Sequence, residues 1–250
     1  MKTDAGLLKW LEDIDTFGIG LVQGIEPDTA QTTRLAERIA PIRETHYGRL
    51  WEFTSDLAHC DTAYTSMALG AHTDTTYFSD PVGLQLFHVL EHTETGGKSL
   101  YVDGFNAALQ LKEQKPWAFD ALTRLHVRAQ CTGDDNTFLQ SDPFPIIRLD
   151  ENGQLAQIRF NNDDRQVLDL DASSVKLFYA ALGEWTRLVR APFNQLWIQL
   201  EPNQAVLVDN RRVLHGRSEF TGLRRVCGCY HHWDDYCSRL KTLRTRQAKN

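Results

Sequence analysis

Residues 61–75, Asp61-Thr-Ala-Tyr-Thr-Ser-Met-Ala-Leu-Gly-Ala-His72-Thr-Asp74-Thr75, contain the pattern around which the chain is organised. His72 and Asp74 are two positions apart, so on an extended backbone both side chains leave the same face. An imidazole and a carboxylate on one face can bind one metal ion. Two ligands do not complete a metal site, so a third ligand is required from elsewhere in the chain.

The third candidate ligand is His215, in the segment Val208-Asp-Asn-Arg-Arg-Val-Leu-His-Gly-Arg217. It follows an apolar segment typical of a strand and precedes a glycine, as expected near a strand end. Either histidine alone is more often a core or surface residue than a ligand. Together with Asp74, however, two imidazoles form the facial triad that binds non-haem Fe(II) and leaves one side of the metal open to a co-substrate and O2.

Arg224 follows His215 by nine residues and opens the segment Arg224-Arg-Val-Cys-Gly-Cys-Tyr230. Alternation along a strand places Arg224 and Tyr230 on one face and Arg225 on the other. An inward arginine beside the metal suits a dicarboxylate, because its planar guanidinium binds the distal carboxylate while the 2-oxo acid end chelates iron. The sequence therefore predicts 2-oxoglutarate as co-substrate, with Ser99 as a candidate hydroxyl near the arginine.

Composition is that of an ordinary globular protein, with 250 residues, 24% charged residues and a formal net charge of -6. No block of Lys or Arg favours nucleic-acid binding, and no apolar run is long enough for a transmembrane helix. The N-terminal residues resemble neither a signal peptide nor a transit peptide, so a cytoplasmic location is expected. The five cysteines fit no zinc pattern, and Cys227 and Cys229 are interpreted as buried structural thiols.

Many short strands with a few outer helices predict a mainly β fold with flanking helices, a double-stranded β-helix or jelly roll. No linker or repeat divides the chain, so residues 1–250 are treated as a single domain. Residues 131–144 lack periodicity and are either loops over the site or strands without a clear pattern. Helices are predicted over 5–16, 27–41, 105–114, 117–125 and 172–190, and strands over 18–22, 83–90, 98–102, 125–129, 145–149, 154–160, 195–200, 205–208 and 224–230.

Several segments together resemble a known family. They are IRETHYGRLW (42–51), FTSD (53–56), DTAYT (61–65), HTDTTYF (72–78), TGG (95–97), VDGF (102–105), NN (161–162), VLHGR (213–217) and CGCY (227–230). The chain is similar to the trimethyllysine and γ-butyrobetaine dioxygenase family of Fe(II)/2-oxoglutarate-dependent oxygenases, and more closely to its trimethyllysine branch. The resemblance covers roughly residues 10–243.

This resemblance implies a role for each matching residue. His72, Asp74 and His215 match the iron ligands, and Arg224 matches the arginine that binds 2-oxoglutarate. An aromatic cage for the trimethylammonium group is implied by four positions that are all aromatic here. A quaternary ammonium has no N–H donor, so ring faces are its natural partners, at about 0.5–2 kcal/mol each. The implied cage residues, each of which alone could be a core residue, are Tyr47, Trp51, Tyr64 and Tyr230.

The resemblance also implies a substrate. Asp61 and Thr75 match an asparagine and a tyrosine that help to hold the substrate carboxylate in the butyrobetaine branch. A carboxylate at Asp61 repels a substrate carboxylate by about 4 kcal/mol at about 4 Å if the effective dielectric constant is about 20, and it attracts an α-ammonium. Thr75 leaves room for a longer substrate, and Asn161 or Asn162 then binds its carboxylate. Alternatively, Asp61 only orders its own loop.

The favoured function is hydroxylation of N6,N6,N6-trimethyllysine at C3, a reaction of the carnitine-biosynthesis type, with ascorbate as a further candidate cofactor. The alternatives are a hydroxylase of γ-butyrobetaine or another small quaternary ammonium compound, and a non-catalytic metal-binding jelly roll that senses a betaine. A sensor needs no oxygen site, so the triad and Arg224 argue against it. A homodimer is left open. Eukaryotic relatives carry an N-terminal zinc domain, whereas this sequence begins at the part that resembles their catalytic domain.

Overall fold

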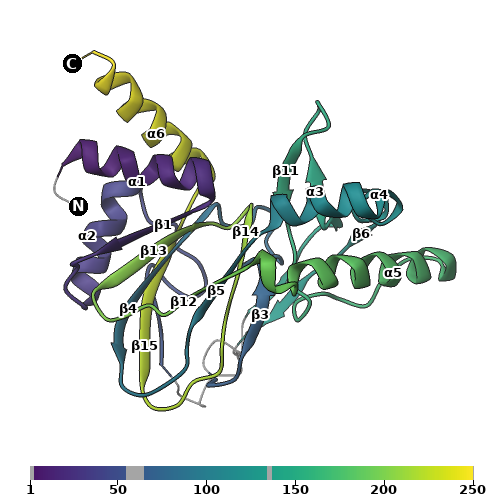
Figure 1. Cartoon of the computed structure of the whole chain (residues 1–250), viewed down its shortest axis with the longest axis horizontal. Helices are drawn as coiled ribbons and strands as arrows, with labels where there is room; N and C mark the ends of the chain where they lie inside the picture. The colour runs from purple at the N-terminus through teal and green to yellow at the C-terminus, as the bar shows by residue number, and fades with distance from the viewer. Residues whose placement is uncertain (1–2, 55–64, 134–136, 250) are drawn as a thin grey trace.

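Two antiparallel sheets form the centre of the computed structural model, which describes residues 3–54, 65–133 and 137–249 (Figure 1). Their arrangement confirms the predicted fold class, a jelly roll with flanking helices. The five-stranded sheet has the order β1 (Ile19–Gln23), β13 (Gln204–Asp209), β4 (Leu84–His92), β15 (Arg224–His231), β2 (Trp51–Phe53). The four-stranded sheet has the order β12 (Gln195–Ile198), β5 (Ser99–Asp103), β14 (Val213–Arg217), β3 (Leu69–His72).

A cluster of apolar residues holds the two sheets together. Val89, Val206 and Val226 contribute from the five-stranded sheet, and Tyr101 and Val213 from the four-stranded sheet. Each of these side chains is almost fully buried. Every second side chain of a strand lies on the same face. The strand faces that carry these apolar residues therefore also carry the polar residues that line the cavity between the sheets.

Helices α1 (Asp4–Phe17), α2 (Thr29–Ile39) and α6 (Trp233–Gln247) cover the outer face of the five-stranded sheet (Figure 1). Along β4, Leu84 and Leu86 point into the core that these helices form, whereas Gln85 and Phe87 line the cavity on the opposite face. The buried thiols of Cys227 and Cys229 agree with the prediction for these two residues.

Helices α3 (Gly104–Gln114), α4 (Pro116–Arg124) and α5 (Ala172–Val189) pack against one another and against the four-stranded sheet. Their bounds lie within two residues of the predicted helices. Capping side chains begin two of them, because Asp103 accepts hydrogen bonds from the backbone at the start of α3, and Asp171 does so at the start of α5. None of the helices in the described residues is both long and apolar enough to cross a bilayer.

The stretch 131–144, which lacks periodicity, contains strands rather than loops alone. Residues within it form a two-stranded ribbon between β7 (Gln130–Thr132) and β8 (Phe138–Gln140). Strands of two or three residues are too short to display an alternating pattern, which explains why the sequence did not predict them. The other ribbons pair β6 (His126–Val127) with β9 (Phe144–Pro145), and β10 (Ile147–Leu149) with β11 (Leu155–Ile158).

Gly228 allows the edge strand β2 to approach β15 closely. A Cβ atom at this position would lie 2.0 Å from the carbonyl oxygen of Leu86 and 2.2 Å from the ring of Trp51. Gly228 is also the direct partner of Trp51 in the pairing of β15 with β2. The absent side chain therefore makes the space in which the Trp51 ring is buried.

Candidate active site

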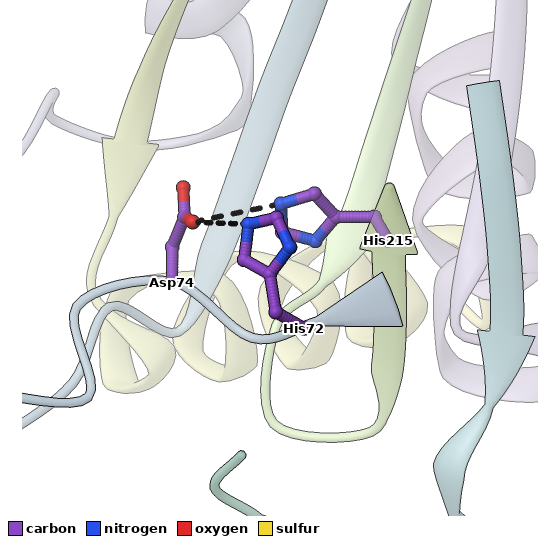
Figure 2. Close-up of side chains that lie close together, drawn as sticks. All are labelled: His72, Asp74 and His215. Carbon is purple, nitrogen blue, oxygen red and sulfur yellow. Dashed lines mark ion pairs between the residues drawn. The ribbon is translucent and has the colours of Figure 1, made fainter. Parts of the chain in front are cut away.

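His72, Asp74 and His215 converge at one end of the four-stranded sheet (Figure 2). His72 ends β3 and lies directly opposite His215 on β14. Asp74 Oδ1 is 3.2 Å from His72 Nε2 and 3.6 Å from His215 Nε2. One nitrogen or oxygen of each residue lies within 4.8 Å of the others, a spacing that could hold a metal ion. Within the described parts of the chain, no other group of three such residues does so.

Asp74 lies on a turn, not on the extended strand that the sequence analysis assumed, because β3 ends at His72. Asn210 holds this turn, since its Oδ1 accepts from Asp74 N at 2.8 Å and its Nδ2 donates to Asp74 O at 3.1 Å. Thr75 follows with φ of 55°, which is unusual for a β-branched residue. Its hydroxyl accepts from Val82 N at 2.9 Å. The turn, rather than strand alternation, directs the carboxylate towards the imidazoles.

Electrostatics inside the cluster favour an ionised carboxylate. Burial alone would raise the pKa of Asp74, but hydrogen bonds with His215 and His72 hold it well below its usual value. Burial lowers the pKa of His215, which favours the neutral imidazole. Although burial also acts to lower the pKa of His72, the adjacent Asp74 outweighs this and raises it. The pocket therefore provides a negative charge that attracts a proton or a metal cation.

The tautomer of His72 suits a metal ligand. Its Nδ1 lies 2.8 Å from Gly70 O, and since a carbonyl only accepts, Nδ1 carries the proton and leaves Nε2 facing Asp74. Two imidazole nitrogens and one carboxylate oxygen are the donors of the 2-His-1-carboxylate centres of non-haem Fe(II) oxygenases. The residues present thus fit the metal that the sequence predicts.

A cavity of about 650 Å³ extends from the triad between the sheets. Arg224, Ser99 and Tyr101 lie together on its wall. Burial lowers the pKa of Arg224 to about 10, so its guanidinium stays protonated at neutral pH. Burial raises the pKa of the Tyr101 hydroxyl, whereas the neighbouring Ser99 hydroxyl and the positive charge of Arg224 act to lower it. Tyr101 was not predicted as a site residue, although it lies two residues after Ser99 and therefore on the same face of β5.

No carboxylate forms a salt bridge with Arg224 anywhere in the described ranges. Its neighbour Arg225 points away from the cavity and pairs with Glu52 at 2.7 Å and Glu91 at 3.7 Å. The predicted alternation of the two arginines is therefore correct. The cavity contains a buried cation that a bound anion could neutralise.

Aromatic rings form another part of the wall. Tyr47 and Tyr230 line the cavity as their predicted roles require. Trp51 does not line it, and its ring instead stacks against that of Phe53, with the ring centroids 4.6 Å apart. Tyr64 lies outside the described residues. The structure adds Phe53 and Tyr77 to the wall, and Tyr77 Oη is 3.1 Å from Tyr47 Oη.

The predicted polar residues are divided between cavity and surface. Asn161 lines the cavity, whereas Asn162 is exposed, does not line it, and accepts from Arg165 Nη2 at 3.3 Å. Thr75 lines the cavity, although its hydroxyl is already bonded to the backbone. Asp61 lies outside the described residues. Asp164, which no sequence pattern indicated, also lines the cavity and accepts a hydrogen bond from the Thr76 hydroxyl at 2.6 Å.

A sequence profile described as the Taurine catabolism dioxygenase TauD, TfdA family matches residues 1–230. The chain belongs to this family. Among solved structures, its fold resembles that of an asparagine oxygenase in complex with Fe(II), 2S,3S-3-hydroxyasparagine and succinate. The TM-score is 0.72 at 14% identity, and the match covers 92% of this chain and 80% of the other. At this identity the likeness shows a shared fold and nothing more.

Curated relatives are similar over nearly the whole chain. Trimethyllysine dioxygenase, mitochondrial, of Gallus gallus is 43% identical over 97% of this chain and 59% of its own length. Gamma-butyrobetaine dioxygenase of Homo sapiens is 33% identical over 98% of this chain and 65% of its own length. This chain therefore spans less than two thirds of the length of either relative. The Gallus gallus protein is named as mitochondrial, so the cytoplasmic location of this chain stays a prediction.

Proposed function

We propose that this TauD, TfdA family member is an Fe(II)- and 2-oxoglutarate-dependent oxygenase that hydroxylates N6,N6,N6-trimethyllysine at C3. The observation that carries the proposal is a single cavity lined by the His72, Asp74 and His215 cluster and by the buried Arg224. The higher identity to a trimethyllysine dioxygenase, 43% against 33% for the butyrobetaine enzyme, favours trimethyllysine as the substrate.

His72, Asp74 and His215 would hold the iron. When bound, Fe(II) supplies the activation of O2 that couples decarboxylation of 2-oxoglutarate to succinate and CO2 with insertion of one oxygen atom into a substrate C–H bond. The protein supplies an ionised carboxylate beside two imidazoles that lie opposite each other on paired strands. Ascorbate, as a reductant that keeps the iron as Fe(II), stays a prediction.

Arg224 would bind the distal carboxylate of 2-oxoglutarate through its planar guanidinium. The arginine is buried and has no acidic partner among the described residues. A carboxylate that binds it therefore gains a charge-assisted hydrogen bond, and no existing ion pair of Arg224 has to break first. The hydroxyls of Ser99 and Tyr101 lie beside it and would complete the polar end of the co-substrate site.

The rings of Tyr47 and Tyr230 would face the trimethylammonium group, with Phe53 and Tyr77 enlarging the aromatic wall. Trp51 would support the cage indirectly by packing against Phe53 and Tyr230. The centroids of the Trp51 and Tyr230 rings are 5.9 Å apart. We assign the cage role of Tyr64 and the α-ammonium role of Asp61 from the family resemblance. Of the two asparagines predicted to bind the substrate carboxylate, Asn161 lines the cavity and would donate to it from its side-chain amide, whereas Asn162 does not line the cavity.

The function is tested by succinate release with a panel of compounds. Trimethyllysine should give a higher kcat/KM than γ-butyrobetaine, because the α-ammonium that only trimethyllysine carries is attracted by the acidic residue Asp61. A neutral tert-butyl isostere of trimethyllysine should bind at least about tenfold more weakly, since each ring face contributes about 0.5–2 kcal/mol to cation binding. The isostere keeps the shape and removes the charge.

The other outcomes of this panel distinguish the alternatives. Equal or faster turnover of γ-butyrobetaine would assign the chain to the second substrate. Equal binding of the isostere would mean that the pocket is only apolar. Metal and betaine binding without any succinate would indicate the non-catalytic sensor. We treat residues 1–250 as one catalytic domain, and a homodimer is left open.

A further inference from the structure

We propose that Gln85 is a positioning residue that makes Asp74 a one-oxygen metal ligand, an inference that rests on the proposed metal site. Gln85 lies on β4, lines the cavity and is 1% exposed. Its Nε2 donates to Asp74 Oδ2 at 2.6 Å. The other oxygen of the carboxylate, Oδ1, faces the two imidazoles.

A second donor reaches the same oxygen from the neighbouring strand. Tyr230 on β15 is the direct partner of Gln85 in the five-stranded sheet, so both side chains leave the same face. The Tyr230 hydroxyl donates to Asp74 Oδ2 at 3.1 Å. With two donors on Oδ2, both its lone pairs are engaged, and Oδ1 alone is directed at the position between the histidines.

The strand register thus determines which oxygen is available to a metal. A carboxylate that used both oxygens would occupy one more coordination position, which the co-substrate and O2 require. Asn210 fixes the backbone of Asp74, so Gln85 and Tyr230 need only control rotation of the carboxylate. Ligand-orienting partners of this kind affect metal affinity strongly.

Folding alone does not account for an amide at this position. Gln85 Oε1 is buried and has no hydrogen-bond partner in the part of the chain that the structure describes. An unpaired buried amide oxygen destabilises a fold, and the next residue on the same face, Phe87, is apolar. The amide oxygen has no bond that the fold would need, so the bond from Nε2 to Asp74 is the property that requires an amide at this position.

The test is titration of Co(II) into the metal-free full chain, for the wild type and for Gln85→Leu. The dissociation constant should rise about 10–100-fold in the variant. The visible absorption of bound Co(II) should also change, because the released oxygen alters the coordination. The metal-free variant should still unfold in one cooperative thermal transition, which separates an altered metal site from a loss of the fold. Gln157→Leu, a buried glutamine on β11 away from the cavity, should change neither affinity nor spectrum.

Wild-type affinity together with a wild-type spectrum in Gln85→Leu overturns the inference, while leaving the metal site intact. A wild-type chain that binds no Co(II) overturns the metal site on which it rests. If Gln85→Leu does not fold, Gln85→Asn replaces it, since the shorter amide cannot reach Asp74 but preserves the polarity. Wild-type behaviour of that variant would equally overturn the role of Gln85.

Discussion

Asp74→Ala is expected to abolish or greatly weaken Fe(II) binding, because the substitution removes the only carboxylate and the only negative charge of the cluster. Its Oδ1 is the atom that lies 3.2 Å and 3.6 Å from the two imidazoles. Loss of an outer-shell partner already costs about 10–100-fold in affinity, so loss of a ligand should cost at least about 100-fold. Anaerobic titration of Fe(II) into the metal-free protein measures the effect.

The matched control is Asp163→Ala, an exposed carboxylate that lines the same cavity but lies outside the cluster. This variant should bind Fe(II) as the wild type does. An unchanged affinity in Asp74→Ala would remove Asp74 from the ligand set, and equal losses in both variants would indicate a general effect of cavity charge.

Arg224→Lys is expected to raise the KM for 2-oxoglutarate about 10–100-fold. The lysine keeps the positive charge but loses the planar pair of donors, and a hydrogen bond to a charged group is worth about 1.5–3 kcal/mol. Its effect on the trimethylammonium substrate should be much smaller, because the aromatic wall is a different part of the cavity. Steady-state kinetics with each substrate varied in turn separates the two effects.

Arg225→Lys is the control, because its guanidinium binds Glu52 and Glu91 on the opposite face of β15. It should leave the KM for 2-oxoglutarate unchanged. Similar increases in both variants would contradict the assignment of Arg224 as the co-substrate residue.

The sequence predicted those features that depend on periodicity. Alternation along 224–230 correctly separated Arg224 from Arg225, and the long apolar strand of residues 83–90 was found close to its observed bounds. The helices were predicted for the same reason, since spacing and capping residues are local signals. His72 and His215 could be assigned to one metal site because the residue types and their order along the chain are enough to indicate a facial triad.

Features that depend on tertiary contacts could not be predicted. The turn at Asp74 requires a positive φ at Thr75, which a β-branched residue rarely adopts, and a bond from Asn210 far along the chain. Trp51 is of a residue type found in aromatic cages, yet its ring lies in the space left by the absent side chain of Gly228 and stacks against Phe53. No sequence motif indicates the role of Gln85, because that role depends on the register between β4 and β15.

Hydroxylation of trimethyllysine is tested by product analysis after the wild-type chain is incubated with Fe(II), 2-oxoglutarate, trimethyllysine and isotopically labelled O2. The expected product is trimethyllysine hydroxylated at C3, identified by NMR, with one labelled oxygen atom from O2 and with succinate formed in equal amount. The absence of a hydroxylated product, or succinate that forms equally well without trimethyllysine, would contradict the proposed function.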